Sequence, residues 1–241
     1  MDIEAFVSDS FAYAKEALAG KWERWAIFIL LSLPFPLIQF LFDPKTISTG
    51  TNMNWDAVPW GQIAVLAGVG FLLSFFLSGY VVRIYRGVKP APDFTAWTEL
   101  FIDGVRLAVV WLLWVLPLFV VLAAGALFAY VTFVSSSSAD DSNIAILLFI
   151  LCLLLVEFIL FIIVVLFGIL GAVRFARTGS IREGVRFSAI LKTIRTMGWL
   201  SYILALIVFI VIAVIYAIIT GILSIIPFIG WARVLIVAPF F

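Results

Sequence analysis

Long apolar runs alternate with short polar segments along the whole chain. Five runs are each long enough for a transmembrane helix, which needs about 20 apolar residues; they cover residues 25–42, 61–82, 107–134, 144–173 and 199–226. A sixth run, 231–241, would give roughly 16 Å of helix, too little for an apolar layer of about 30 Å. We therefore expect an all-α membrane protein with five complete transmembrane helices. We expect a sixth helix to begin at the C-terminus, with the given sequence ending inside that span.

Composition excludes a soluble protein. Apolar residues make up 65% of the 241 positions and charged residues 12%, whereas a soluble domain is roughly half apolar and about a quarter charged. The 15 basic and 14 acidic residues give a net charge of +1. Because no global field draws the chain toward polyanions, we expect no nucleic-acid partner.

The distribution of basic residues predicts the orientation. Thirteen of the 15 lie before the first run, between the second and third, or between the fourth and fifth. The opposite side keeps Lys45 and Arg233, with a serine tract at 135–138. Since cytoplasmic loops carry an excess of Lys and Arg, we expect a multi-pass protein of the cell membrane with a cytoplasmic N-terminus.

Three basic-side stretches resemble one another. Each starts with an aromatic residue near small residues and reaches a glycine just before a run; they begin at Phe11, Phe94 and Phe187 and end at Gly20, Gly104 and Gly198. We interpret them as three parallel repeats, about 1–90, 91–180 and 181–241, within one integral membrane domain spanning 1–241. Each repeat would be an amphipathic helix followed by a transmembrane hairpin, because apolar residues recur every three or four positions over 3–22. The alternative is a coincidence of composition at membrane exits.

The stretch 92–104, PDFTAWTELFIDG, carries a resemblance to a known family, together with Gly79, Tyr80 and the RIYRG sequence at 83–87. It resembles the domain-of-unknown-function family numbered 4013, multi-pass membrane proteins found largely in archaea. The similarity extends to Gly20-Lys21-Trp22 and Gly198-Trp199. The resemblance implies an archaeal cell membrane and no established activity, and it transfers no catalytic residue.

Glu157 is the one acid inside a predicted span. A central acid costs about 2.5 to 3.5 kcal/mol on insertion scales, so we expect its carboxyl to be protonated or paired. Gly168 follows close to three full turns later, which places Glu157 on a small-residue face that points into the bundle. Tyr216 has a matching depth and is a candidate hydrogen-bond partner, and Arg233 is a second one. Two interpretations stay open: a proton or cation relay, or a neutral acid hydrogen-bonded between helices.

The segment between the fourth and fifth runs holds six basic residues. They are candidate ligands for anionic lipid headgroups, because each basic residue near such a surface contributes about 1 kcal/mol: Arg174, Arg177, Arg182, Arg186, Lys192 and Arg195. The alternative is that the cluster only reflects the orientation signal.

The sequence contains few of the residues that usually carry out catalysis. The chain has no His and a single Cys, so the usual bases and zinc ligands are missing. It contains no HExxH, Walker or GxSxG motif. We expect no enzymatic activity, no cofactor and no metal.

These patterns favour a non-enzymatic integral membrane protein, a structural or assembly subunit of a membrane complex. Its partners would be membrane lipids and other membrane or cytoplasmic protein subunits. The alternative is a transporter or channel for a small solute or amphiphile that uses Glu157 and helix kinks at Pro34, Pro36, Pro117 and Pro227. Polar residues within the spans are few, which favours the first interpretation.

Overall fold

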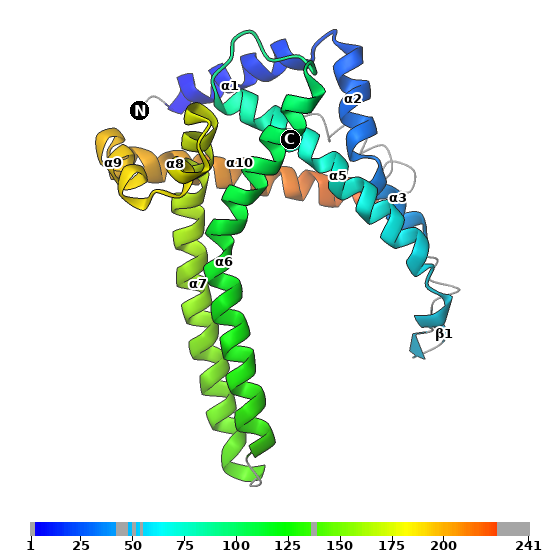
Figure 1. Ribbon diagram of the computed structural model, residues 1–241, viewed down its shortest axis with the longest axis vertical. Coiled ribbons are helices and arrows are strands. Elements are labelled where there is room, and N and C mark those ends of the chain that lie inside the picture. Colours follow the sequence, from blue (N-terminus) through cyan, green and yellow to red (C-terminus); the bar gives the residue numbers. More distant parts are fainter. Residues whose placement is uncertain (1–2, 42–47, 50–51, 54, 136–138, 226–241) are drawn as a thin grey trace. The chain divides into compact units, whose positions relative to one another are not determined.

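Helices dominate the computed structural model, which describes residues 3–41, 48–49, 52–53, 55–135 and 139–225 (Figure 1). The first part contains α1 (Ile3–Leu18), α2 (Trp22–Ser32) and α3 (Pro34–Leu41). A two-residue antiparallel hairpin, β1 (Ser48–Thr49) and β2 (Asn52–Met53), and the short 3-10 helix η1 (Trp55–Ala57) follow. The remaining helices are α5 (Trp60–Tyr85), α6 (Trp97–Ser135), α7 (Ala139–Thr178), α8 (Ile181–Val185), α9 (Phe187–Met197) and α10 (Trp199–Ile225).

Four of these helices, α5, α6, α7 and α10, are long and apolar enough to cross a membrane. Helices suit that role because each backbone N–H and C=O is satisfied within the segment where no water is present. The buried share of the apolar window falls from 22% in α5 to 0% in α10. Their apolar side chains therefore face outward, which confirms the membrane class expected from composition.

The first apolar run is not one helix. It is divided into α2 and α3, which meet at Leu33 and Pro34. Proline lacks the N–H that would continue the helix, and its ring clashes with the preceding turn. The side chains of Pro34 and Phe35 lie against α5, about 3.1–3.2 Å from the position a Cβ would take at Gly70. The expected complete span over 25–42 is therefore replaced by two shorter helices, and the described part of the chain has four candidate spans.

The threefold repeat is not confirmed. Separate helices are present at α1 and α9, which end before Gly20 and Gly198, both with positive φ. The middle stretch instead runs without a break into α6 through Gly104. A Cβ at Gly104 would overlap the carbonyl oxygen of Phe75, so this glycine permits close helix packing and does not end a helix. The expected sixth span at 231–241 lies outside the described residues.

The chain forms two compact units, each described here by itself. The first contains Met1–Val105 with Ile194–Phe241, and the second contains Arg106–Thr193. In the first unit a core forms where α1, α2, α5 and the start of α6 meet; it includes Leu18, Phe28, Tyr80, Phe94 and Leu100. Tyr80 stacks on Phe94 with ring centroids 4.6 Å apart, and Phe28 meets both rings edge-on.

The second unit is built on an antiparallel hairpin of α6 and α7, which lie side by side in Figure 1. Small residues allow the close approach: a Cβ at Gly125 would meet Leu153, and one at Gly168 would meet the ring of Trp111. Trp114 stacks on Phe167 with ring centroids 6.2 Å apart. This packing resembles other membrane helix pairs, where small residues and van der Waals contact drive association.

Candidate functional site

Arg24 joins three segments of the first unit. It lies in the first turn of α2, and its side chain is 8% exposed. Its Nε donates to Oδ1 of Asp93 at 2.8 Å, and its Nη2 contacts the same oxygen. Its Nη1 donates to the carbonyl oxygen of Ala17 at 3.0 Å, and its Nη2 donates to that of Ala91 at 3.1 Å. We call this set the Arg24 clasp; it holds the end of α1 and residues 91–93 against α2.

Two further arginines extend this network. Arg83, near the end of α5, donates to the carbonyl oxygen of Asp93 at 2.9 Å and lies 4.0 Å from Glu99. Arg86 donates to Oδ2 of Asp103 at 2.6 Å. Tyr13 of α1 donates to the carbonyl oxygen of Val88 at 3.1 Å, and burial raises the pKa of its phenol. Arg83 and Arg86 thus donate hydrogen bonds to other groups of the same chain.

The second unit has a comparable arrangement around Glu183 of α8. Arg174 donates to Oε2 of Glu183 at 2.6 Å and to the hydroxyl of Thr193 at 3.3 Å. Arg186 donates to Oε1 of Glu183 at 3.1 Å. Hydrogen bonds from Arg174 and then Arg186 hold the pKa of the Glu183 carboxyl below its ordinary value. We call this set the Glu183 clasp, and it ties α7, α8 and α9 together.

The six candidate lipid ligands therefore differ in role. Arg174 and Arg186 contact Glu183, which offsets part of their charge. The side chains of the other four are exposed: Arg177, Arg182, Lys192 and Arg195. Two of them belong to α9, in which Ile190 and Ile194 are fully buried while Lys192 and Arg195 are exposed.

Glu157 lies on the face of α7 that contacts α6. Leu153, one turn earlier, lies against Gly125, and Val164, two turns later, is buried. Its Oε1 is shielded from solvent and has no hydrogen-bond partner among the described residues. The spacing to Gly168 predicted that Glu157 faces into the bundle, and this position agrees with that direction. The expected interhelical hydrogen bond to Oε1 is not made by any described residue.

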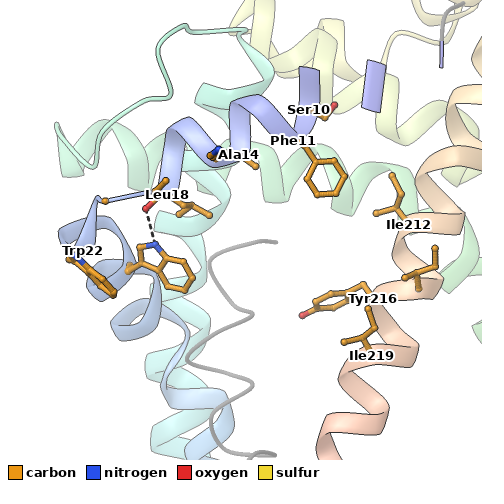
Figure 2. Close-up of a pocket in the computed structure, with 13 residues that line it drawn as sticks. Ser10, Phe11, Ala14, Leu18, Trp22, Ile212, Tyr216 and Ile219 are labelled. Atoms are coloured by element: carbon orange, nitrogen blue, oxygen red, sulfur yellow. Dashed lines mark hydrogen bonds between the residues drawn. The ribbon is translucent and has the colours of Figure 1, made fainter. Parts of the chain in front are cut away.

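Neither suggested partner of Glu157 is described within the unit that contains it. Arg233 lies outside the described residues. Tyr216 belongs to the first unit, where it lines a pocket of about 860 Å³ between α1, the start of α2 and α10 (Figure 2). Most of the lining is apolar, including Phe11 and Trp22, while Ser10 and Lys15 add a hydroxyl and an ammonium. Such a lining suits an apolar chain better than a polar substrate.

Sequence reasoning missed both clasps. It counted Arg24 only as an orientation signal, took Arg174 as an orientation signal and a candidate lipid ligand, and quoted Asp93 only as part of a motif. Arg24 and Asp93 are 69 residues apart in sequence, so no local spacing connects them. The one available signal was the motif at 92–104, which begins beside Asp93.

Comparison with known proteins gives one positive finding. A family model described as "Protein of unknown function (DUF4013)" matches residues 63–225. The match includes α5 to α10 almost completely, and with them the whole Glu183 clasp and the Asp93 part of the Arg24 clasp. No curated protein and no solved structure matches the chain.

Proposed function

The chain belongs to the DUF4013 family of proteins of unknown function, and we propose that it is a non-enzymatic structural or assembly subunit of a membrane complex. In this proposal the arginine-rich segments face the cytoplasm. There the exposed side chains of Arg177, Arg182, Lys192 and Arg195 contact anionic lipid headgroups or an acidic partner subunit.

The main support is where the apolar and the polar side chains lie in the structure. The apolar windows of α6, α7 and α10 are at most 11% buried within the described chain, so lipid or other spans must cover them. The polar groups near the helix ends serve internal clasps around Arg24 and Glu183. A chain organised this way offers outer surfaces for assembly, because the polar groups within each clasp already contact one another.

A transporter or channel is the second candidate, and Glu157 favours it. A shielded carboxyl oxygen inside a span is a functional-site hypothesis by default, and this one has no partner in the described part of the hairpin. A transport pathway would also need polar groups along its length, and the neighbouring positions of α6 and α7 are almost entirely apolar. The assembly role is therefore preferred.

Native copurification would test the assembly role. The full chain would be extracted with its surrounding lipid, and the retained proteins and lipids identified by mass spectrometry. We expect a second protein, or further copies of this chain, at fixed stoichiometry. A monomer without protein partners that drives uptake of a solute into vesicles would contradict the proposal.

A pair of variants would test the lipid contact separately. Replacing Arg177, Arg182 and Arg195 with Gln removes three exposed cations of the segment 177–195, and should reduce the anionic lipid retained per chain. The control replaces Lys15, Lys89 and Arg106, which are exposed elsewhere, and should retain more. Each cation near an anionic surface contributes about 1 kcal/mol, so equal retention by both variants would argue against a specific contact.

A further inference from the structure

Glu157 stands in a hairpin that contains no cation to pair with it. No Lys or Arg occurs between Arg106 and Arg174, and the chain has no His. The contact between Gly125 and Leu153 sets the antiparallel register, which places Glu157 beside the turn of α6 that precedes Gly125. Arg106 lies nineteen positions before Gly125, roughly 28 Å along the helix axis. The hairpin therefore cannot neutralise a carboxylate from within.

The other ionisable groups of α6 and α7 are distant or face away. Tyr130 and Cys152 are exposed, so they do not lie in the interface that shields Oε1. Asp140 and Asp141, at the start of α7, precede Glu157 by at least sixteen positions, roughly 24 Å of helix. The remaining charged residues lie near the start of α6 and the end of α7. They are Glu99, Asp103 and Arg106 in α6, and Arg174 and Arg177 in α7.

A metal cation does not fit this position. Metal ions such as Ca²⁺ and Mg²⁺ need several oxygen ligands, and among the described residues no three acidic or Cys side chains are grouped to hold one. A proton needs only the carboxyl itself. It also removes the charge whose transfer into an apolar medium is unfavourable.

We propose that Glu157 is a proton-binding site inside the membrane hairpin, and that it is present at neutral pH as a carboxylic acid. Protonation leaves one oxygen as a weaker acceptor and turns the other into an O–H donor. An Oε1 without a partner in the described part of the chain is then tolerated, because a neutral acceptor costs less to bury than a charged one. This site is independent of the assembly role proposed above.

Infrared difference spectroscopy would test the proposal on the full chain in lipid at neutral pH. Glu157→Gln keeps the shape of the side chain but cannot carry an acid proton. The parent minus Glu157→Gln spectrum should contain a carboxylic acid carbonyl band equivalent to one group per chain, and this band should shift in D2O. A carboxylate band in its place would overturn the proposal. Matching helical circular dichroism and thermal unfolding would show that both proteins are folded.

If Glu157→Gln does not fold, a chemical probe applied to the parent protein tests the same proposal. In the parent, a membrane-soluble carbodiimide takes up the acid proton on nitrogen while the carboxyl oxygen bonds to its central carbon. The acyl group then moves to nitrogen and leaves a stable acylurea. We expect this adduct on Glu157 and not on Glu183, whose carboxylate is held by Arg174 and Arg186.

Two results of this second test would count against the proposal. If neither the acid band nor the adduct is observed, Glu157 is a carboxylate with a partner from outside the hairpin. If added Na⁺ at constant pH abolishes the band and the adduct, Na⁺ displaces the proton, and the site exchanges cations instead of binding protons alone.

Discussion

At the scale of single residues, the Arg24 clasp is asymmetric. The Arg24 side chain is 8% exposed, whereas that of Asp93 is 67% exposed. Removing the guanidinium would leave the carbonyl oxygens of Ala17 and Ala91 without their donor. Removing the charge of Asp93 would leave those two bonds in place. The two halves of this ion pair therefore contribute differently to stability.

We expect Arg24→Gln to lower the free energy of unfolding by about 2–3 kcal/mol, because hydrogen bonds from charged groups contribute about 1.5–3 kcal/mol and buried acceptors are left unpaired. Asp93→Asn should cost less than about 1 kcal/mol, as is usual for a pair with one exposed partner. Thermal and denaturant unfolding in detergent would measure both, with Lys89→Gln as the control. Equal losses at Arg24 and Asp93 would show that the carbonyl contacts are unimportant.

The Glu183 clasp predicts a dependence on pH. The folded-state pKa of Glu183 lies below its ordinary value of 4.5 because Arg174 and Arg186 donate to the carboxylate. Its stabilising contribution is therefore complete above the ordinary value and is lost as pH falls through the lower folded value. The melting temperature of the parent should fall more steeply than that of Glu183→Gln when the pH drops below about 4.5. Parallel curves for the two proteins would contradict this assignment.

At the scale of elements, glycines decide which helices approach each other closely. In α5, a Cβ at Gly79 would overlap the backbone carbonyl of Leu100, while nothing lies within 4 Å of a Cβ at Gly68. A corresponding overlap occurs in the second unit between Gly171 and the carbonyl oxygen of Gly184. Backbone atoms cannot yield as a flexible side chain can. Replacing glycine with alanine in α5 should therefore have opposite effects at Gly79 and at Gly68.

Gly79→Ala should destabilise the protein by about 1–3 kcal/mol, the usual cost of overpacking. Gly68→Ala should be neutral or stabilising by up to about 1 kcal/mol, because Ala has the higher helix propensity. Thermal unfolding of both variants in one lipid mixture would make the comparison. If Gly68→Ala is the more harmful of the two, the α5 contact is not the one described.

The sequence predicted most elements but few of their contacts. Unbroken apolar runs identified α5, α6, α7 and α10, because lipid imposes length and composition on each helix by itself. The division at Pro34 was not expected, since neighbouring helices can repair a proline kink and the sequence does not show whether they do. The inward face of Glu157 followed from helical spacing to Gly168. The partners of Arg24 and Arg174 did not follow, because tertiary packing brings them together.

At the scale of the whole molecule, the orientation in the membrane is the property that the charge pattern predicts most directly. We expect Ser137 on the outside and Ser180 in the cytoplasm. In a Cys152→Ala background, Ser137→Cys should react with an impermeant thiol reagent in intact cells, and Ser180→Cys should react only after permeabilisation. The reverse result would mean that the topology is inverted. Arg177, Arg182, Lys192 and Arg195 would then face the outside and not the cytoplasm.

The continuity of α6 places a constraint on how this protein can change in evolution. Both borders between the compact units fall inside helices, α6 and α9, and not in loops. One residue inserted between Leu100 and Gly104 would turn every later position of α6 by about 100° relative to the earlier ones. Leu100 would still meet Gly79, but Gly104 would be turned away from the carbonyl oxygen of Phe75. Length variation among descendants of this gene should therefore collect between Arg86 and Ala91, outside the helices, and avoid the first three turns of α6.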